Sequence, residues 1–161
     1  MRGPNSSATL RVVQARDSDN DDDAVASVEG FRPQIPDDWY EAKYIGHETA
    51  IVFMACKCFL HFEIVQPGAS MGVRLFRAFR VRKLVGRPAK GGKFVVHAGG
   101  DLFALLARLL DIKLRTDRIT FRPLRSMLFR IKTRTVTTNH AQKERPEQSR
   151  YSVIADIERE E

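Results

Sequence analysis

Basic and aromatic residues alternate with apolar ones in the segment RLFRAFRVRK, residues 74–83, which contains no acidic residue. Side chains two residues apart point to the same face of a β-strand, so three of its arginines and Phe76 share one face. Cations neutralise the phosphates of nucleic acids, and exposed aromatic rings stack on unpaired bases. The segment therefore predicts a face that binds a single-stranded nucleic acid.

A second basic strand is predicted in MLFRIKTRTVTTN, residues 127–139, where Arg130, Lys132 and Arg134 alternate with apolar and threonine side chains. Trp39 and Tyr151 lie in other strand-like segments and add two rings. The predicted nucleic-acid-binding residues are Arg74, Phe76, Arg80, Arg82, Lys83, Arg130, Lys132, Arg134, Trp39 and Tyr151. The alternative is that both basic faces are the solvated outside of a sheet, with Phe76 in the core.

Two segments of the sequence contain residues that could bind a metal ion. Asp17, Asp19 and Asp21 stand at the spacing of a calcium loop, but Asp22 and Val28 occupy the places that require glycine and glutamate. Cys56, Cys58 and His61 are possible zinc ligands, but strand alternation puts His61 on the opposite face from both cysteines. Buried thiols are the simpler interpretation, and we expect neither a metal nor a cofactor.

The sequence gives only weak support for a catalytic function. Asp37 and the segment Glu41-Ala42-Lys43 resemble a compressed nuclease signature, but four residues along one strand separate Asp37 from Glu41 by about 13 Å. No Walker loop, G-x-G-x-x-G or readable Ser–His–Asp spacing occurs. We therefore expect a protein that is not an enzyme.

The charge distribution favours a polyanionic partner. The chain has 161 residues and a formal net charge of +7, and residues 73–134 alone hold 17 basic and three acidic side chains. Residues 1–34 hold four basic and six acidic side chains, including the block DSDNDDD. We expect 1–34 to be an acidic, disordered tail whose charge mimics nucleic acid and weakens binding, and 35–161 to be one β-rich domain.

The elements that position these residues are predicted as about five strands and one helix. Strands are expected in IPDDWYEAKYIG (35–46), in IVFMACKCFLHFEIV (51–65, one strand or two), in the two basic segments, in the short KFVVH, and around Tyr151–Ile154. The helix is expected at about 101–113, capped by Asp101, with a leucine stripe. The fold class is therefore mainly β (α+β), a small barrel or a half-open antiparallel sheet with one packed helix.

The order of these segments resembles a phage-encoded family of small OB-like proteins. The matching residues, within about 35–136, are Ile35, Pro36, Tyr40, Ala42 and Glu48, then Phe62, Glu63 and Ile64 before Gly68 and Gly72, then the leucine-rich helix. Ser126 replaces the family's usual glycine before the late strand, and the segment after Thr138 has no counterpart. The resemblance implies an OB-like fold and single-stranded-DNA binding beside recombination or replication genes.

Together, the residues and the resemblance predict a cytoplasmic, non-catalytic accessory protein of a phage or mobile element that binds single-stranded DNA, or RNA, in replication or recombination. No apolar run reaches the ~18–20 residues of a membrane span, and no signal pattern opens the chain. One alternative is an adaptor whose basic face docks an acidic replication or host protein. Another is a binder of duplex DNA or structured RNA.

Overall fold

The computed structural model describes residues 33–111, 113–116, 119–139 and 141–160. Its elements, in chain order, are β1 (Trp39–Val52), β2 (Ala55–Ile64), β3 (Arg74–Arg80), β4 (Lys83–Val85), β5 (Lys93–Val95), helix α3 (Asp101–Leu110), the 3-10 turn η2 (Arg122–Ser126), β6 (Phe129–Val136), the 3-10 turn η3 (Glu147–Ser149) and β7 (Tyr151–Arg159). The acidic block and the calcium-loop candidates of the amino-terminal segment lie outside the described residues.

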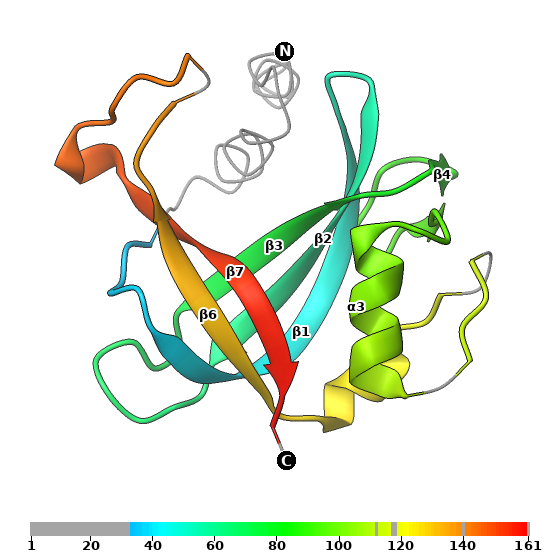
Figure 1. The fold of residues 1–161 in the computed structure, drawn as a ribbon, viewed down its shortest axis with the longest axis horizontal. Helices are drawn as coiled ribbons and strands as arrows, with labels where there is room; N and C mark the ends of the chain where they lie inside the picture. Colours follow the sequence, from blue (N-terminus) through cyan, green and yellow to red (C-terminus); the bar gives the residue numbers. More distant parts are fainter. Residues whose placement is uncertain (1–32, 112, 117–118, 140, 161) are drawn as a thin grey trace, which may run out of the picture.

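Five strands form one antiparallel main sheet in the order β3-β2-β1-β6-β7, and β4 and β5 form a separate small sheet. β6 and β7 cross over β3 in Figure 1, and Arg77 Nη1 of β3 lies 3.9 Å from Asp156 Oδ1 of β7. These two edge strands approach each other without pairing in the part of the chain that the structure describes. The mainly β class is thus confirmed, and the sheet is half-open; it is not a closed barrel.

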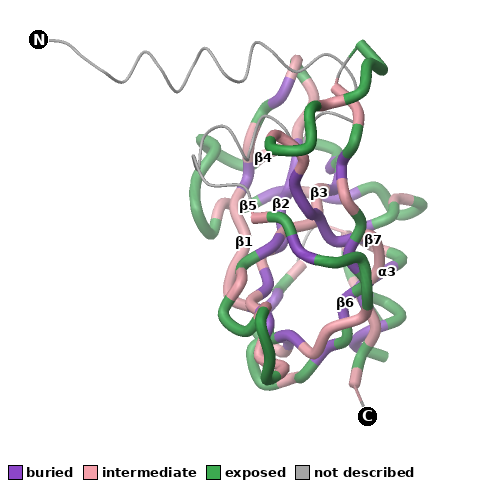
Figure 2. The backbone as a smooth tube through the Cα atoms, turned by 90° about the vertical axis from the view of Figure 1, so that its left-hand side faces the viewer, coloured by how far each residue is buried: buried purple, intermediate pink, exposed green. Residues whose placement is uncertain are grey.

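The predicted alternation is confirmed within β3 and β6, but the first basic strand is shorter than predicted, since β3 ends at Arg80 and Lys83 belongs to β4. In β3, Leu75 and Phe79 are buried while Arg74 and Arg80 are exposed. In β6, Phe129, Ile131 and Thr133 are buried, and the three basic residues between and after them are exposed. We call the buried side of the main sheet its inner face and the opposite side its outer face. Figure 2 shows buried stretches running through these strands and exposed loops between them.

The run IVFMACKCFLHFEIV is two strands, because β1 and β2 form a hairpin that turns at Phe53 and Met54. β1 therefore extends beyond the predicted first strand, and it carries a bulge between Tyr44 and Gly46. β7 likewise continues to Arg159, past the predicted Tyr151–Ile154. The hairpin turn was missed because it contains none of the glycine, asparagine or proline residues that usually mark a turn.

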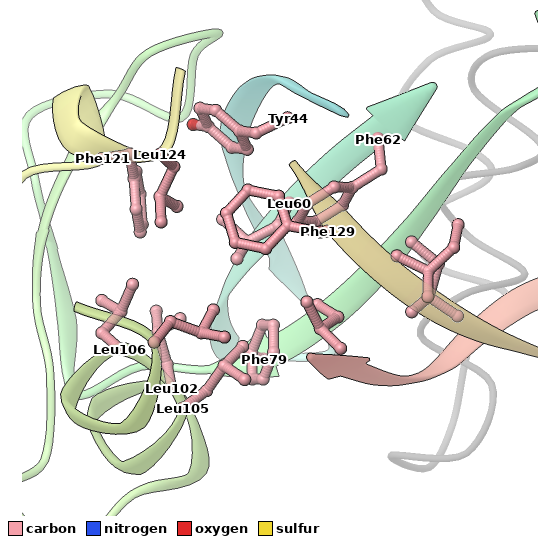
Figure 3. Close-up of a cluster of buried hydrophobic side chains, with 14 of the residues drawn as sticks. Tyr44, Leu60, Phe62, Phe79, Leu102, Leu105, Leu106, Phe121, Leu124 and Phe129 are labelled. Carbon is pink, nitrogen blue, oxygen red and sulfur yellow. The ribbon is translucent and has the colours of Figure 1, made fainter. Parts of the chain in front are cut away.

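Helix α3 packs its leucines against the inner face of the main sheet (Figure 3). It ends at Leu110, earlier than the predicted 113, because Asp111 adopts the left-handed conformation that terminates helices. Asp101 is its first residue and not its cap: Gly100 occupies that position without a side-chain bond. Around the leucines, the aromatic rings of Tyr44, Phe62, Phe121 and Phe129 complete the core.

Both cysteines pack against this core, as alternation predicted. Cys58 is fully buried and Cys56 partly so, and both are free thiols. Burial raises the pKa of the Cys58 thiol. His61 lies on the outer face, hydrogen-bonded to Glu48. These side chains therefore do not converge on one site.

Candidate nucleic-acid interface

The outer face of β3 presents Arg74, Phe76 and Arg80, and the three differ in environment. Arg74 Nε donates to Glu63 Oε1 at 3.0 Å, so this cation is paired within the sheet. The Phe76 ring is half-buried, with its centroid 5.8 Å from Phe59. Arg80 is exposed, opposite Lys57 of β2 in the strand register. Of the three residues, only Arg80 offers an uncompensated charge at the surface.

A pocket of about 520 Å³ opens beside Phe76. Its walls come from β1, β2, β3, the start of β7 and the segments around Lys90 and Arg125. Glu48 and His61 line it as a pair, with His61 Nε2 donating to Glu48 Oε1 at 2.8 Å. This hydrogen bond outweighs burial and holds the pKa of Glu48 below its ordinary value. The pocket is thus an aromatic and polar hollow with cations at its edge.

The loop that carries Lys90 is fixed to β1 by several hydrogen bonds. Thr49 N–H donates to Ala89 O at 3.0 Å, and Gly91 N–H donates to His47 O at 2.8 Å. A Cβ at Gly92 would collide with Thr49 Oγ1, so only glycine allows this close approach. These bonds therefore fix the backbone from which the Lys90 side chain extends.

The His47 side chain completes this attachment. Its Nε2 lies 2.9 Å from Gly92 O, and its Nδ1 lies 3.3 Å from the Tyr44 hydroxyl. Burial lowers the pKa of His47 and raises that of Tyr44. A neutral imidazole that donates from Nε2 and accepts at Nδ1 satisfies both bonds. His47 is thus a structural link between the core and the loop.

Six exposed cations follow one another from the end of β3 to β5. We call them the basic run: Arg80, Arg82, Lys83, Arg87, Lys90 and Lys93. No acidic residue occurs between Val65 and Gly100. No carboxylate of the described residues forms an ion pair with any of the six. The basic run is accordingly a continuous positive stretch of the described chain without ion pairs.

The predicted site residues on β6 are placed differently. Arg130 lies between Glu41 of β1 and Glu158 of β7 in the strand register, and its Nε lies 3.8 Å from Glu160 Oε2. Trp39 is partly buried, and Arg130 Cζ lies 5.2 Å from its ring centroid. Acidic neighbours therefore offset the charge of Arg130.

Three other predicted residues, Lys132, Arg134 and Tyr151, complete the β6–β7 region. Lys132 is exposed opposite Trp39, with its Nζ 6.0 Å from the centroid of the Trp39 ring. Arg134 follows two residues later on the same face of β6 and is also exposed. Tyr151 is only 1% exposed and is packed against Val136, Val153 and Phe76, with Arg145 Cζ 5.3 Å from its ring centroid. The Tyr151 ring therefore does not present a face to solvent for stacking.

Nine of the ten predicted site residues thus fall into three places, and Arg134 lies further along β6. Arg74, Phe76 and Tyr151 line the pocket, Trp39, Arg130 and Lys132 cluster where β1 meets β6, and Arg80, Arg82 and Lys83 begin the basic run. Arg87, Lys90 and Lys93 complete the run and were not among the predicted site residues. Their signal was present in the long acid-free stretch around GRPAKGG, a segment interpreted only as a loop.

Among the described residues, no group of histidine, cysteine, aspartate and glutamate side chains is arranged to hold a metal ion. None of the helices in the described ranges has the length and apolar character that a membrane span requires. No protein-family model, no curated protein and no solved structure matches the chain significantly.

Proposed function

We propose that this protein binds single-stranded DNA, or RNA, without catalysis, through the basic run and the adjoining outer face of β2 and β3. The observation that carries the proposal is the basic run itself, in which six exposed cations form no ion pair with a carboxylate of the described residues, and only Lys90 has a carboxylate, that of Glu48, near enough to interact with it electrostatically. Unpaired cations on a surface attract a polyanion, because binding releases the counterions condensed on its phosphates. Paired cations such as Arg130 contribute less to this effect.

The strand order supports an OB-like assignment. An OB fold is a partly open five-stranded barrel that binds oligonucleotides on the face of its second and third strands. Here a β1-β2-β3 meander, a helix and then the β6-β7 pair follow in that order, and β7 approaches β3. The outer face of β2 and β3 carries Phe76, His61 and the pocket. This agrees with the resemblance of residues 35–136 to the phage-encoded family.

A single strand suits the surface better than a duplex does, because Phe76 lies beside a hollow where an unpaired base has room to enter. Base–aromatic stacking contributes about 1–3 kcal/mol per base and tolerates any base. Phosphate contacts carry no sequence information. We therefore propose a cytoplasmic accessory protein of a phage or mobile element with little sequence preference, acting in replication or recombination beside other proteins of those processes.

Fluorescence anisotropy with labelled oligothymidylate, duplex DNA and RNA tests the proposal. Contact with six phosphates predicts a log–log salt slope of about −4 on a single strand. Binding that is stronger to duplex, or a slope near zero, would contradict it. Binding to a polyglutamate peptide without binding to oligothymidylate would favour the adaptor alternative, since the basic run also complements an acidic protein surface.

A further inference from the structure

The turn between β1 and β2 has an unusual composition. Val52 and Ala55 pair across it, so the turn has two residues, Phe53 and Met54, whose φ angles are 48° and 66°. Such turns need the left-handed conformation at both positions and normally contain asparagine and glycine, because a Cβ atom disfavours it. The backbone at this turn is therefore strained.

The same turn exposes apolar side chains. Met54 is 96% exposed and Ile51 is 44% exposed. The hairpin projects at the top of Figure 1. An exposed methionine in a strained position stabilises the fold neither by packing nor by backbone preference. A role outside the folding of the chain accounts for both features.

Two parts of the basic run are attached to the two edges of this hairpin near its base. On the β2 edge, Val81 N–H, between Arg80 and Arg82, donates to Cys56 O at 2.9 Å. On the β1 edge, Ala89 O, next to Lys90, accepts from Thr49 N–H at 3.0 Å. Both attachments lie within a few residues of the turn. The apolar tip thus rises between cations held on both of its sides.

We propose that this hairpin tip is a wedge that enters the base stack where a duplex opens into single strands. Met54 separates the last stacked bases, while the flanking cations hold the phosphates of the two diverging strands. Apolar side chains that enter between base steps unstack them in this way in known DNA-binding proteins. The inference rests on the proposed function and names its substrate: a junction between duplex and single strand.

The geometry favours nucleic acid over a membrane surface. Stable anchoring in a bilayer takes more apolar groups than two side chains supply, since even one myristoyl chain binds only marginally. One side chain is enough to disrupt a base step. A membrane role is nevertheless distinguishable by experiment, because anionic vesicles contain no bases.

The test uses a forked oligonucleotide with 2-aminopurine at the junction, whose fluorescence rises when it unstacks. The wild-type protein should raise the fluorescence, and Met54→Leu should preserve the rise because it keeps an apolar side chain. Met54→Gly should lose the rise and bind the fork about fivefold or more weakly, from the lower range of base-stacking contributions. Its affinity for oligothymidylate should change little, and its melting temperature should stay equal or increase, since glycine relieves the strain.

The outcomes separate the two proposals. If the wild type binds no oligonucleotide, the proposed function fails. If it binds oligothymidylate but Met54→Gly unstacks the fork as well as the wild type does, the wedge alone is wrong. Co-sedimentation of the wild type, but not of Met54→Gly, with phosphatidylserine vesicles, without an effect at the fork, would replace the wedge with a membrane contact.

Discussion

Removing two unpaired cations should weaken the salt dependence of binding more than removing two paired ones. In the double variant Arg87→Gln/Lys93→Gln, four of the six cations in the basic run remain. Each phosphate contact on a single strand contributes about −0.7 to the log–log salt slope, so the slope should change from about −4.2 to about −2.8. Between about 50 and 200 mM salt, the wild type should then lose about 300-fold in affinity and the variant about 50-fold.

The matched control is Arg108→Gln/Arg130→Gln, which removes the same formal charge. Arg108 Nη2 lies 3.4 Å from Asp156 Oδ1 and Arg130 Nε lies 3.8 Å from Glu160 Oε2, so carboxylates already offset both cations. Its slope should stay close to that of the wild type. Anisotropy titrations with labelled oligothymidylate at several salt concentrations measure both slopes. Equal slopes in the two variants, or a larger change in the control, would refute the assignment of binding to the basic run.

Three further predictions follow from the site. Gly92→Ala should destabilise the fold by about 1–3 kcal/mol, because its Cβ collides with Thr49, while Gly99→Ala, whose Cβ meets nothing within 4 Å, should be nearly neutral in urea unfolding. Because the pKa of His47 is lowered in the fold, the unfolded chain takes up its proton first. The free energy of unfolding should therefore have its maximal contribution from His47 above about pH 6.5 and decrease as the pH falls below that value. In the variant His47→Gln, which retains a donor toward Gly92, the free energy of unfolding should decrease less over the same pH range. An identical decrease in both proteins would exclude His47 as the cause. Deletion of residues 1–30 should tighten oligonucleotide binding at low salt, since it removes six acidic side chains and only three basic ones; unchanged affinity would show that this segment does not compete with the nucleic acid.

Local periodicity was enough to predict which side chains of β3 and β6 face outward. In β3 and β6 the alternation of apolar and basic residues matches the observed burial. The leucine stripe likewise predicted helix α3 and its buried side. These properties depend on neighbours along the chain, and the hydrophobic effect acts on them residue by residue.

Which cations are paired with carboxylates could not be predicted from local periodicity, because the pairing depends on the register between strands that are distant in the sequence. The pairing of Arg74 with Glu63 and of Arg130 with Glu160 brings together residues that no local pattern connects. The burial of Tyr151 depends on the approach of β7 to β3, which is also a long-range property. The sequence therefore predicted exposed cations correctly but could not separate paired cations from unpaired ones.

Lysine footprinting by acetylation and mass spectrometry, with and without oligothymidylate, locates the interface most directly. The proposed function predicts that Lys83, Lys90 and Lys93 become protected, since they belong to the basic run, while exposed Lys113 outside it stays reactive. Protection of Lys132 without protection of the basic run, or no change at any lysine under binding conditions, would contradict the proposed interface.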